Sequence, residues 1–250
     1  MMNYLIFTDL DGTLLDHHNY TFENASDLIK RLKAHKIPII FNTSKTYEET
    51  KVLQKTMQID DPVIVENGGA IYIDGSPHIL GKSSSDLMDF IRAQTYINLS
   101  VLSQMSIEEI VKRTGLNSKS AKMAKKRDYS QPFLFDSGDL ERFKADAKNA
   151  GLDVIKGGRF YHLIDGAQSK GRALTKLKNI YEKTHNKQYK TVAIGDSAND
   201  LTMLEVADFA ALVKKPDGTY EPFEREDLFR SNYAADRGWS DAIKRIVFER

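Results

Sequence analysis

The sequence repeats one pattern: a short apolar run followed by a stretch with helical spacing. The runs are continuous instead of alternating between apolar and polar residues, as in parallel strands covered by helices on both faces. They are Tyr4–Phe7, Ile37–Phe41, Val63–Val65, Val192–Ile194 and Ala210–Val213. This pattern predicts an α/β fold built on an open, doubly wound parallel sheet.

Helical patterns lie between and after these runs. In Lys170–Lys183 the apolar residues recur at helical spacing and define one buried stripe. Thr46 and Glu49 form a capping-box pair at the start of another helix. The predicted helices are Asn24–His35, Thr46–Met57, Lys170–Lys183 and Ser240–Arg250.

The middle of the chain mixes helical and strand-like pieces and interrupts the parallel pattern. The helical pieces are Ser84–Gln94, Ser106–Thr114 and Gly138–Ala150. The strand-like pieces are Pro132–Phe135, Asp153–Lys156 and Phe160–Ile164. We interpret residues 83–165 as an inserted α+β cap domain and residues 1–82 with 166–250 as the core.

Composition excludes several classes of function. The 250 residues carry a formal net charge of +1, which gives no general attraction for nucleic acid or an anionic membrane. Without cysteine there is no disulfide, thiolate metal site or cysteine nucleophile. The first apolar run meets Asp9 too early for a signal peptide, and no run is long enough to span a membrane. We therefore expect a cytoplasmic protein.

The segment DLDGT, residues 9–13, carries the strongest chemical signal. If the chain is extended there, Asp9 and Asp11 point the same way, and their mutual repulsion requires a cation or a proton between them. This arrangement suits a magnesium site with one nucleophilic and one acid/base carboxylate. Asp, Gly and Thr are also ordinary turn residues, so the motif needs support from elsewhere in the chain.

Three later segments supply polar groups at strand ends or helix starts. Thr43 and Ser44 follow the second run, where they could bind phosphate or only cap the next helix. Lys170 stands at a helix start, an unfavourable place for a cation unless an anion lies nearby; the alternative is a solvated lysine. In the segment GDSAND, residues 195–200, Asp196 is a candidate metal ligand, and Asn199 and Asp200 would support it without binding the metal directly. The alternative is that this segment only caps the next helix.

In combination these segments resemble the four motifs of the haloacid dehalogenase (HAD) superfamily of phosphotransferases. The matching pieces are DLDGT, the threonine of FNTSK, the lysine of SKGRAL, and GDSANDLTML. The resemblance implies a Rossmann-like core with its active site at the carboxyl ends of the strands. It also implies that Asp9 is the nucleophile, that Asp11 is the acid and base, and that Thr43 and Lys170 hold the phosphoryl group. Magnesium would be held by Asp9, the Asp11 carbonyl and Asp196.

The position of the cap narrows the resemblance further. Only one helix separates Asp11 from Thr43, so the cap must lie between Thr43 and Lys170, as in the C2-capped, Cof-like branch. Within that branch the segments NTSKT, ENGGAIY, KKRDYSQPF and GGRFYHL resemble the mannosyl-3-phosphoglycerate phosphatase family. That family implies a glycosyl-phosphoglycerate substrate whose carboxylate suits an arginine fork. The substrate-binding candidates are Ser44, Lys45, Arg127, Ser130, Arg159 and His162.

Other functions stay open at this stage. A general sugar-phosphate phosphatase of the same branch would share the core motifs, since substrate choice lies in the cap. A phosphomutase usually carries its cap between the first two motifs, where this chain has room for only one helix. A binding protein would not need a suitable residue at every catalytic position, and this chain has one at each. His17 and His18 lack a third ligand for zinc and are predicted to be loop residues. The sequence gives no sign of the oligomeric state.

Overall fold

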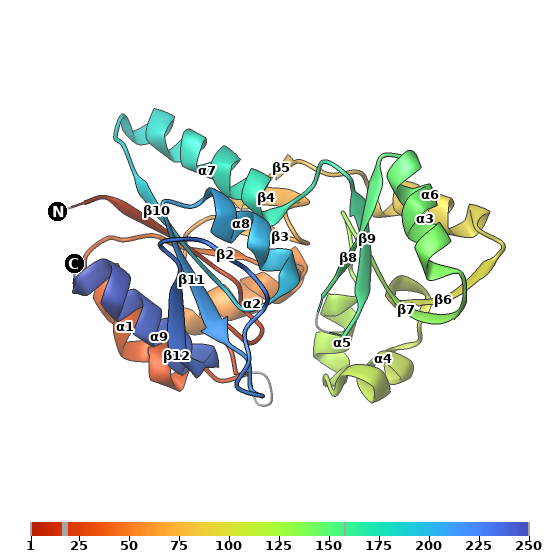
Figure 1. The fold of residues 1–250 in the computed structure, drawn as a ribbon, viewed down its shortest axis with the longest axis horizontal. Coiled ribbons are helices and arrows are strands. Elements are labelled where there is room, and N and C mark those ends of the chain that lie inside the picture. The colour runs from red at the N-terminus through yellow and green to blue at the C-terminus, as the bar shows by residue number, and fades with distance from the viewer. Residues whose placement is uncertain (1, 17–19, 158, 250) are drawn as a thin grey trace.

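A computed structural model describes residues 2–16, 20–157 and 159–249, so His17 and His18 lie outside the described residues. The chain forms two lobes, each built on its own sheet (Figure 1). Both termini lie in the larger lobe, at the end remote from the smaller one (Figure 1). The smaller lobe interrupts the larger in sequence, between β5 and α7.

The larger lobe holds an eight-stranded sheet of order β12-β11-β10-β1-β2-β3-β4-β5. The six strands from β12 to β3 pair in parallel; five of them correspond to the predicted apolar runs, and β12 was not predicted. Strands β4 and β5 add two antiparallel strands at one edge. The strands are β1 (Tyr4–Thr8), β2 (Ile39–Asn42), β3 (Val63–Val65), β4 (Ala70–Ile73), β5 (Ser76–Ile79), β10 (Lys190–Gly195), β11 (Phe209–Lys214) and β12 (Phe229–Ala234).

Helices cover both faces of this sheet because successive strand residues point to opposite sides. Ile6 packs with α1, α2 and α9 on one face, and Phe7 packs with α7 and α8 on the other. The helices are α1 (Ser26–Ala34), α2 (Tyr47–Met57), α7 (Lys170–His185), α8 (Leu201–Val206) and α9 (Ala235–Ile243), with short helical turns at Glu23–Ala25, Ala198–Asp200 and Lys244–Phe248. The predicted doubly wound α/β core is therefore confirmed.

Helix boundaries follow the capping residues. The predicted capping box is present at α2, where Thr46 accepts a hydrogen bond from the Glu49 backbone N–H and the Glu49 side chain accepts one in return. The last helix was predicted to start at Ser240 but begins at Ala235, because the buried Trp239 extends its apolar face towards the N-terminus.

The smaller lobe is a four-stranded antiparallel sheet of order β6-β7-β9-β8. Its strands are β6 (Ile97–Val101), β7 (Gln131–Gly138), β8 (Leu152–Lys156) and β9 (Tyr161–Asp165). Its helices are α3 (Ser84–Ala93), α4 (Ile107–Thr114), α5 (Ser118–Ala124) and α6 (Leu140–Asn149), with a short turn at Leu102–Gln104. An apolar cluster joins α3 and α6 to this sheet, and a separate one joins α4 and α5. We propose that residues 83–165 are a cap inserted into the core.

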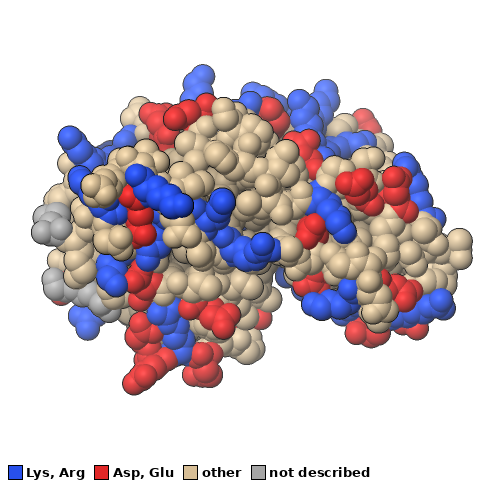
Figure 2. Space-filling view, turned by 90° about the horizontal axis from the view of Figure 1, so that it is seen from above, with Lys and Arg blue, Asp and Glu red and all other residues tan. Residues whose placement is uncertain are grey.

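The surface carries charges of both signs on both lobes, with no large field of one sign on the face in view (Figure 2). This distribution agrees with the balanced overall composition. Among the described residues, no helix is long and apolar enough to cross a membrane.

Candidate active site

The first motif lies at the carboxyl end of a central strand. β1 ends at Thr8, one residue before Asp9, whose backbone N–H donates to the Ile194 carbonyl of β10 at 2.9 Å. Gly12 has a φ of +84°, a left-handed conformation that lets the chain turn back beyond the strand end. Asp9 and Asp11 therefore belong to a turn beyond the strand and do not follow the extended geometry that the sequence suggested.

Lys170 reaches this turn from the start of α7. Its ammonium lies 2.6 Å from Asp9 Oδ1 and 2.6 Å from Asp200 Oδ1, and its side chain is completely buried. These two carboxylates are the anionic partners that a lysine at a helix N-terminus needs. The alternative of a solvated lysine is thus excluded by the geometry.

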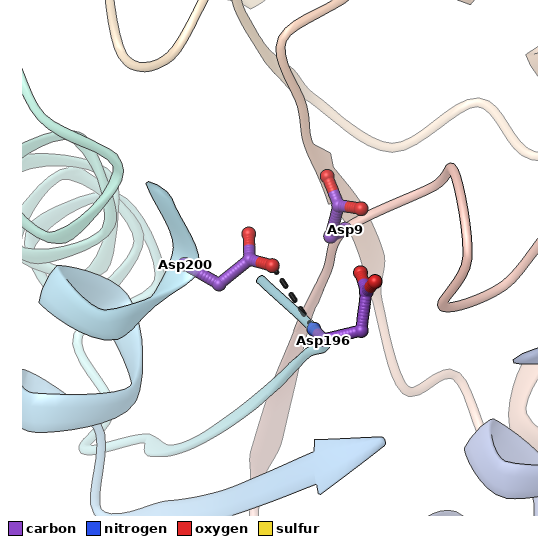
Figure 3. A group of neighbouring side chains, drawn as sticks. All are labelled: Asp9, Asp196 and Asp200. Atoms are coloured by element: carbon purple, nitrogen blue, oxygen red, sulfur yellow. Dashed lines mark hydrogen bonds between the residues drawn. The ribbon is translucent and has the colours of Figure 1, made fainter. Parts of the chain in front are cut away.

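Asp196 and Asp200 complete an acidic cluster with Asp9. One carboxylate oxygen from each of the three buried residues lies within 4.8 Å of the others. Figure 3 shows the three side chains coming from β1 and from the turn after β10. Asp196 Oδ1 accepts a hydrogen bond from the Thr13 hydroxyl at 2.9 Å, which fixes that carboxylate.

The three carboxylates differ in how many of their oxygens already accept a hydrogen bond. Asp200 Oδ1 accepts from Lys170, and its Oδ2 accepts from the backbone N–H groups of Asp196 and Ser197, each at 3.0 Å. Asp9 and Asp196 each keep one oxygen with no hydrogen bond from Lys170 or Thr13. The pattern suits Asp9 and Asp196 as direct ligands of a metal and Asp200 as a residue that orients Lys170 and the loop.

Electrostatics indicate that a cation belongs here. Burial raises the pKa of Asp9 to about 7 against the opposing attraction of Lys170, and Asp200 and Asp11 add to the rise. Burial also raises the pKa of Asp196 well above its usual value, with further contributions from Asp200 and Asp9. Three buried carboxylates face one ammonium, so a hard divalent cation with oxygen ligands would relieve the repulsion. The residues present therefore fit a divalent metal.

Asp11 has a different partner from the acidic cluster. Its Oδ2 lies 2.8 Å from the ammonium of Lys45, whose side chain is nearly buried. Burial alone would lower the pKa of Lys45, but Asp11 and Glu49 outweigh it and raise the pKa. Asp11 Oδ1 is buried without a hydrogen-bond partner among the described residues. Lys45, which we predicted to bind substrate, thus contacts the second carboxylate of the motif.

Thr43 and Ser44 lie in the loop between β2 and α2. Thr43 is buried, and its hydroxyl accepts from the Lys45 backbone N–H at 3.2 Å. The Ser44 carbonyl accepts from an Nη of Arg127 at 2.6 Å, so the cap meets the core at this loop. Arg127 also donates from Nε to the Ala124 carbonyl at 2.8 Å.

The other cap candidates do not all gather at one point. Ser130 donates to the buried carboxylate of Glu66 at 2.5 Å, and Arg159 donates to the Thr114 carbonyl at the end of α4. His162 is buried on β9, and its Nδ1 has no partner among the described residues. Burial lowers the pKa of His162 to about 3, and the cations Arg127, Lys170 and Lys156 lower it further.

Two residues of the β3–β4 turn also belong to the site, although the sequence prediction did not assign them. Glu66 accepts hydrogen bonds from the Asp128 and Tyr129 backbone N–H groups at 2.9 and 3.2 Å, as well as from Ser130. Asn67 accepts at 2.9 Å from Asn199, the residue predicted to lie behind Asp196. The position of the polar ENGG segment at the end of the third predicted strand suggests that it borders the substrate, but it gives neither residue a role.

Comparison with known proteins agrees with this geometry. The family model of haloacid dehalogenase-like hydrolases matches residues 6–215, which include all four motifs. The chain belongs to the haloacid dehalogenase-like hydrolases. It is 35% identical over 262 residues to a Persephonella marina protein named glucosyl-3-phosphoglycerate/mannosyl-3-phosphoglycerate phosphatase, covering 98% of this chain and 97% of that one. A Methanococcoides burtonii protein of the same name is also 35% identical, with 98% of each chain covered.

Solved structures share the fold at lower sequence identity. A Thermoplasma acidophilum protein superimposes with a TM-score of 0.70 at 22% identity over 98% of each chain. The sucrose-phosphatase from Synechocystis, solved with sucrose and phosphate, gives a TM-score of 0.68 at 15% identity, again over 98% of each chain. Because these matches cover nearly the whole chain, both lobes have counterparts in the two solved structures.

Proposed function

We propose that this protein is a Mg²⁺-dependent phosphatase that hydrolyses mannosyl-3-phosphoglycerate, or a close glycosyl-phosphoglycerate, to the glycosylglycerate and phosphate. The observation that carries the proposal is the buried contact of Asp9 with Lys170 beside Asp196 and Asp200. The substrate class is supported by the near full-length similarity to proteins named for that activity.

In the proposed reaction a carboxylate oxygen of Asp9 attacks phosphorus and the bond to the leaving oxygen breaks, which produces an aspartyl phosphate. Asp11 gives its proton to the leaving oxygen and then takes a proton from the water that cleaves the intermediate. Lys45 holds the Asp11 carboxylate in place at 2.8 Å. Lys170 and Thr43 face the phosphoryl oxygens, whose negative charge must be stabilised throughout the transfer.

Asp9, the Asp11 carbonyl and Asp196 would hold Mg²⁺, which supplies charge neutralisation between the nucleophile and the phosphoryl group. The ligand set fits a small hard cation, because Mg²⁺ is usually held by one or two carboxylates and keeps several waters. Asn199 and Asp200 would not bind the metal themselves but would help to hold its ligands in place.

The cap supplies the proposed contacts to the rest of the substrate. Arg127 brings a fixed positive charge to the Ser44 loop, where it suits the carboxylate of a phosphoglycerate. His162 offers a buried nitrogen from β9. We assign Ser44, Ser130 and Arg159 to the same region as substrate-binding or supporting residues. The protein would act on a small molecule in the cytoplasm, without nucleic acid or a membrane.

The test is phosphate release from mannosyl- and glucosyl-3-phosphoglycerate beside simple hexose phosphates, with MgCl₂ or with a chelator. We expect turnover only with the metal, and kcat/KM at least ~10-fold higher for the glycosyl-phosphoglycerates. Comparable kcat/KM on hexose phosphates would instead favour a general sugar-phosphate phosphatase. Asp9→Asn serves as the inactive control.

A further inference from the structure

Asn67 lies in a turn with an unusual backbone. Glu66, Asn67 and Gly68 have φ values of +50°, +60° and +91°, so three consecutive residues adopt the left-handed conformation. Side chains with a Cβ rarely adopt this conformation, and such strain is concentrated at functional sites. Asn tolerates it better than most residues.

The turn is held against the reaction centre from two sides. The Asn67 backbone N–H donates to the Thr43 carbonyl at 2.9 Å, and its side-chain oxygen accepts from Asn199 at 2.9 Å. In the sheet, β1 and β2 separate β3 from β10. The bond between Asn67 and Asn199 therefore joins loops on either side of the strand ends that carry Asp9 and Thr43.

The side-chain nitrogen of Asn67 is buried without a hydrogen-bond partner in the part of the chain that the structure describes. The residue is 1% exposed. A buried amide N–H group normally has an acceptor, because leaving it unpaired costs free energy. An acceptor that arrives with the substrate would satisfy it.

We propose that Asn67 is a substrate-contacting residue whose side-chain N–H donates a hydrogen bond to an oxygen of the substrate's phosphate group. The inference rests on the proposed phosphatase function and adds to it a neutral donor from the turn after β3, beside the donors from Thr43 and Lys170. Asn199 fixes the side-chain oxygen, so the N–H₂ group is held with its donors pointing away from Asn199.

Two variants of Asn67 separate this contact from the backbone. Asn67→Gly removes the side chain, and glycine takes the left-handed conformation without strain. Asn67→Asp keeps the shape and the acceptor for Asn199 but replaces the donor with an oxygen. The matched control is Asn186→Gly, because Asn186 also has a left-handed φ, of +49°, at the end of α7.

The measurements are kcat and KM for phosphate release, the inhibition constant of inorganic phosphate, and thermal unfolding, all with MgCl₂. We expect both Asn67 variants to lower kcat/KM by about 10- to 100-fold and to weaken phosphate inhibition by about 10-fold or more. Asn186→Gly should stay within about twofold of wild type in both quantities.

Folded Asn67 variants with unchanged phosphate inhibition would overturn the inference, even if kcat/KM fell. If Asn67→Gly is too unstable to assay, the phosphate inhibition constant of Asn67→Asp decides the question. A wild-type protein that releases phosphate from no ester would instead refute the proposed function, so the two failures are distinguishable.

Discussion

The ammonium nitrogen of Lys170 lies 2.6 Å from a carboxylate oxygen of Asp9, and both side chains are buried. Asp200 holds the same ammonium from the other side at 2.6 Å. Burial alone would lower the pKa of Lys170, but the two carboxylates outweigh it and raise the pKa, so the lysine stays charged. A fixed positive charge therefore stands beside the proposed nucleophile.

Replacing Lys170 by Met removes this charge and leaves two carboxylates unpaired. We expect Lys170→Met to lower kcat/KM for phosphate esters by at least ~100-fold, because a charge aimed at the phosphoryl group is lost. Steady-state kinetics measure the effect. The control is Lys30→Met, since Lys30 is 77% exposed on α1. Equal kinetics for the two variants would show that Lys170 has only a structural role.

Asp9→Asn keeps the shape of the side chain and removes its nucleophilic oxygen. We expect kcat to fall at least ~1,000-fold, as the loss of a covalent nucleophile should cause. Asp27→Asn on the surface of α1 is the control, because the Asp27 side chain is 97% exposed. A variant that retained a tenth of the wild-type turnover would contradict the assignment of Asp9.

Metal binding should be visible in stability as well as in activity. A cation that binds only the folded state adds about 2.7 kcal/mol to the free energy of unfolding at 100 times its Kd. For a chain of this size, that increase corresponds to a rise in Tm of roughly 5–10 °C. We expect MgCl₂ to produce this rise in the wild type but not in Asp196→Asn. A similar rise in Asp196→Asn would remove Asp196 from the ligand set.

Much of the fold could be predicted because its signals are local. Continuous apolar runs marked β1, β3 and β10, and the Thr46–Glu49 pair marked the start of α2. The antiparallel strand β5 was missed because Ser76–Ile79 is exposed and carries no apolar pattern. Strand β4 was missed although Ala70–Ile73 is a short, mostly buried apolar run. Pairing with β4 forms β5, and pairing depends on tertiary context.

The candidate site shows the same division between local and tertiary information. The sequence identified Asp9, Lys170 and Asp196 because each stands at a strand end or a helix start. It could not show that Asp11 pairs with Lys45, since the turn at Gly12 sets the direction of that side chain. The contact between Asn67 and Asn199 joins residues 132 positions apart, so only the folded chain reveals it.

His162 should make the stability of the protein depend on pH in the acidic range. Its pKa is lowered from 6.5 to about 3 in the folded state, first by burial and then by Arg127, Lys170 and Lys156. Between these two values the unfolded chain binds a proton at this position that the folded chain does not. The free energy of unfolding therefore falls as the pH falls, by up to ~1.4 kcal/mol per pH unit.

His162→Gln removes this titration, so its stability should decline less on acidification. Between pH 6.5 and 4.5 we expect wild type to lose about 2–3 kcal/mol more than the variant in urea denaturation. His78→Gln is the control, because His78 lies on the exposed strand β5. Parallel pH profiles for wild type and His162→Gln would mean that His162 takes up its proton in the folded state. Its ring would then be accessible to water in the folded protein and not buried.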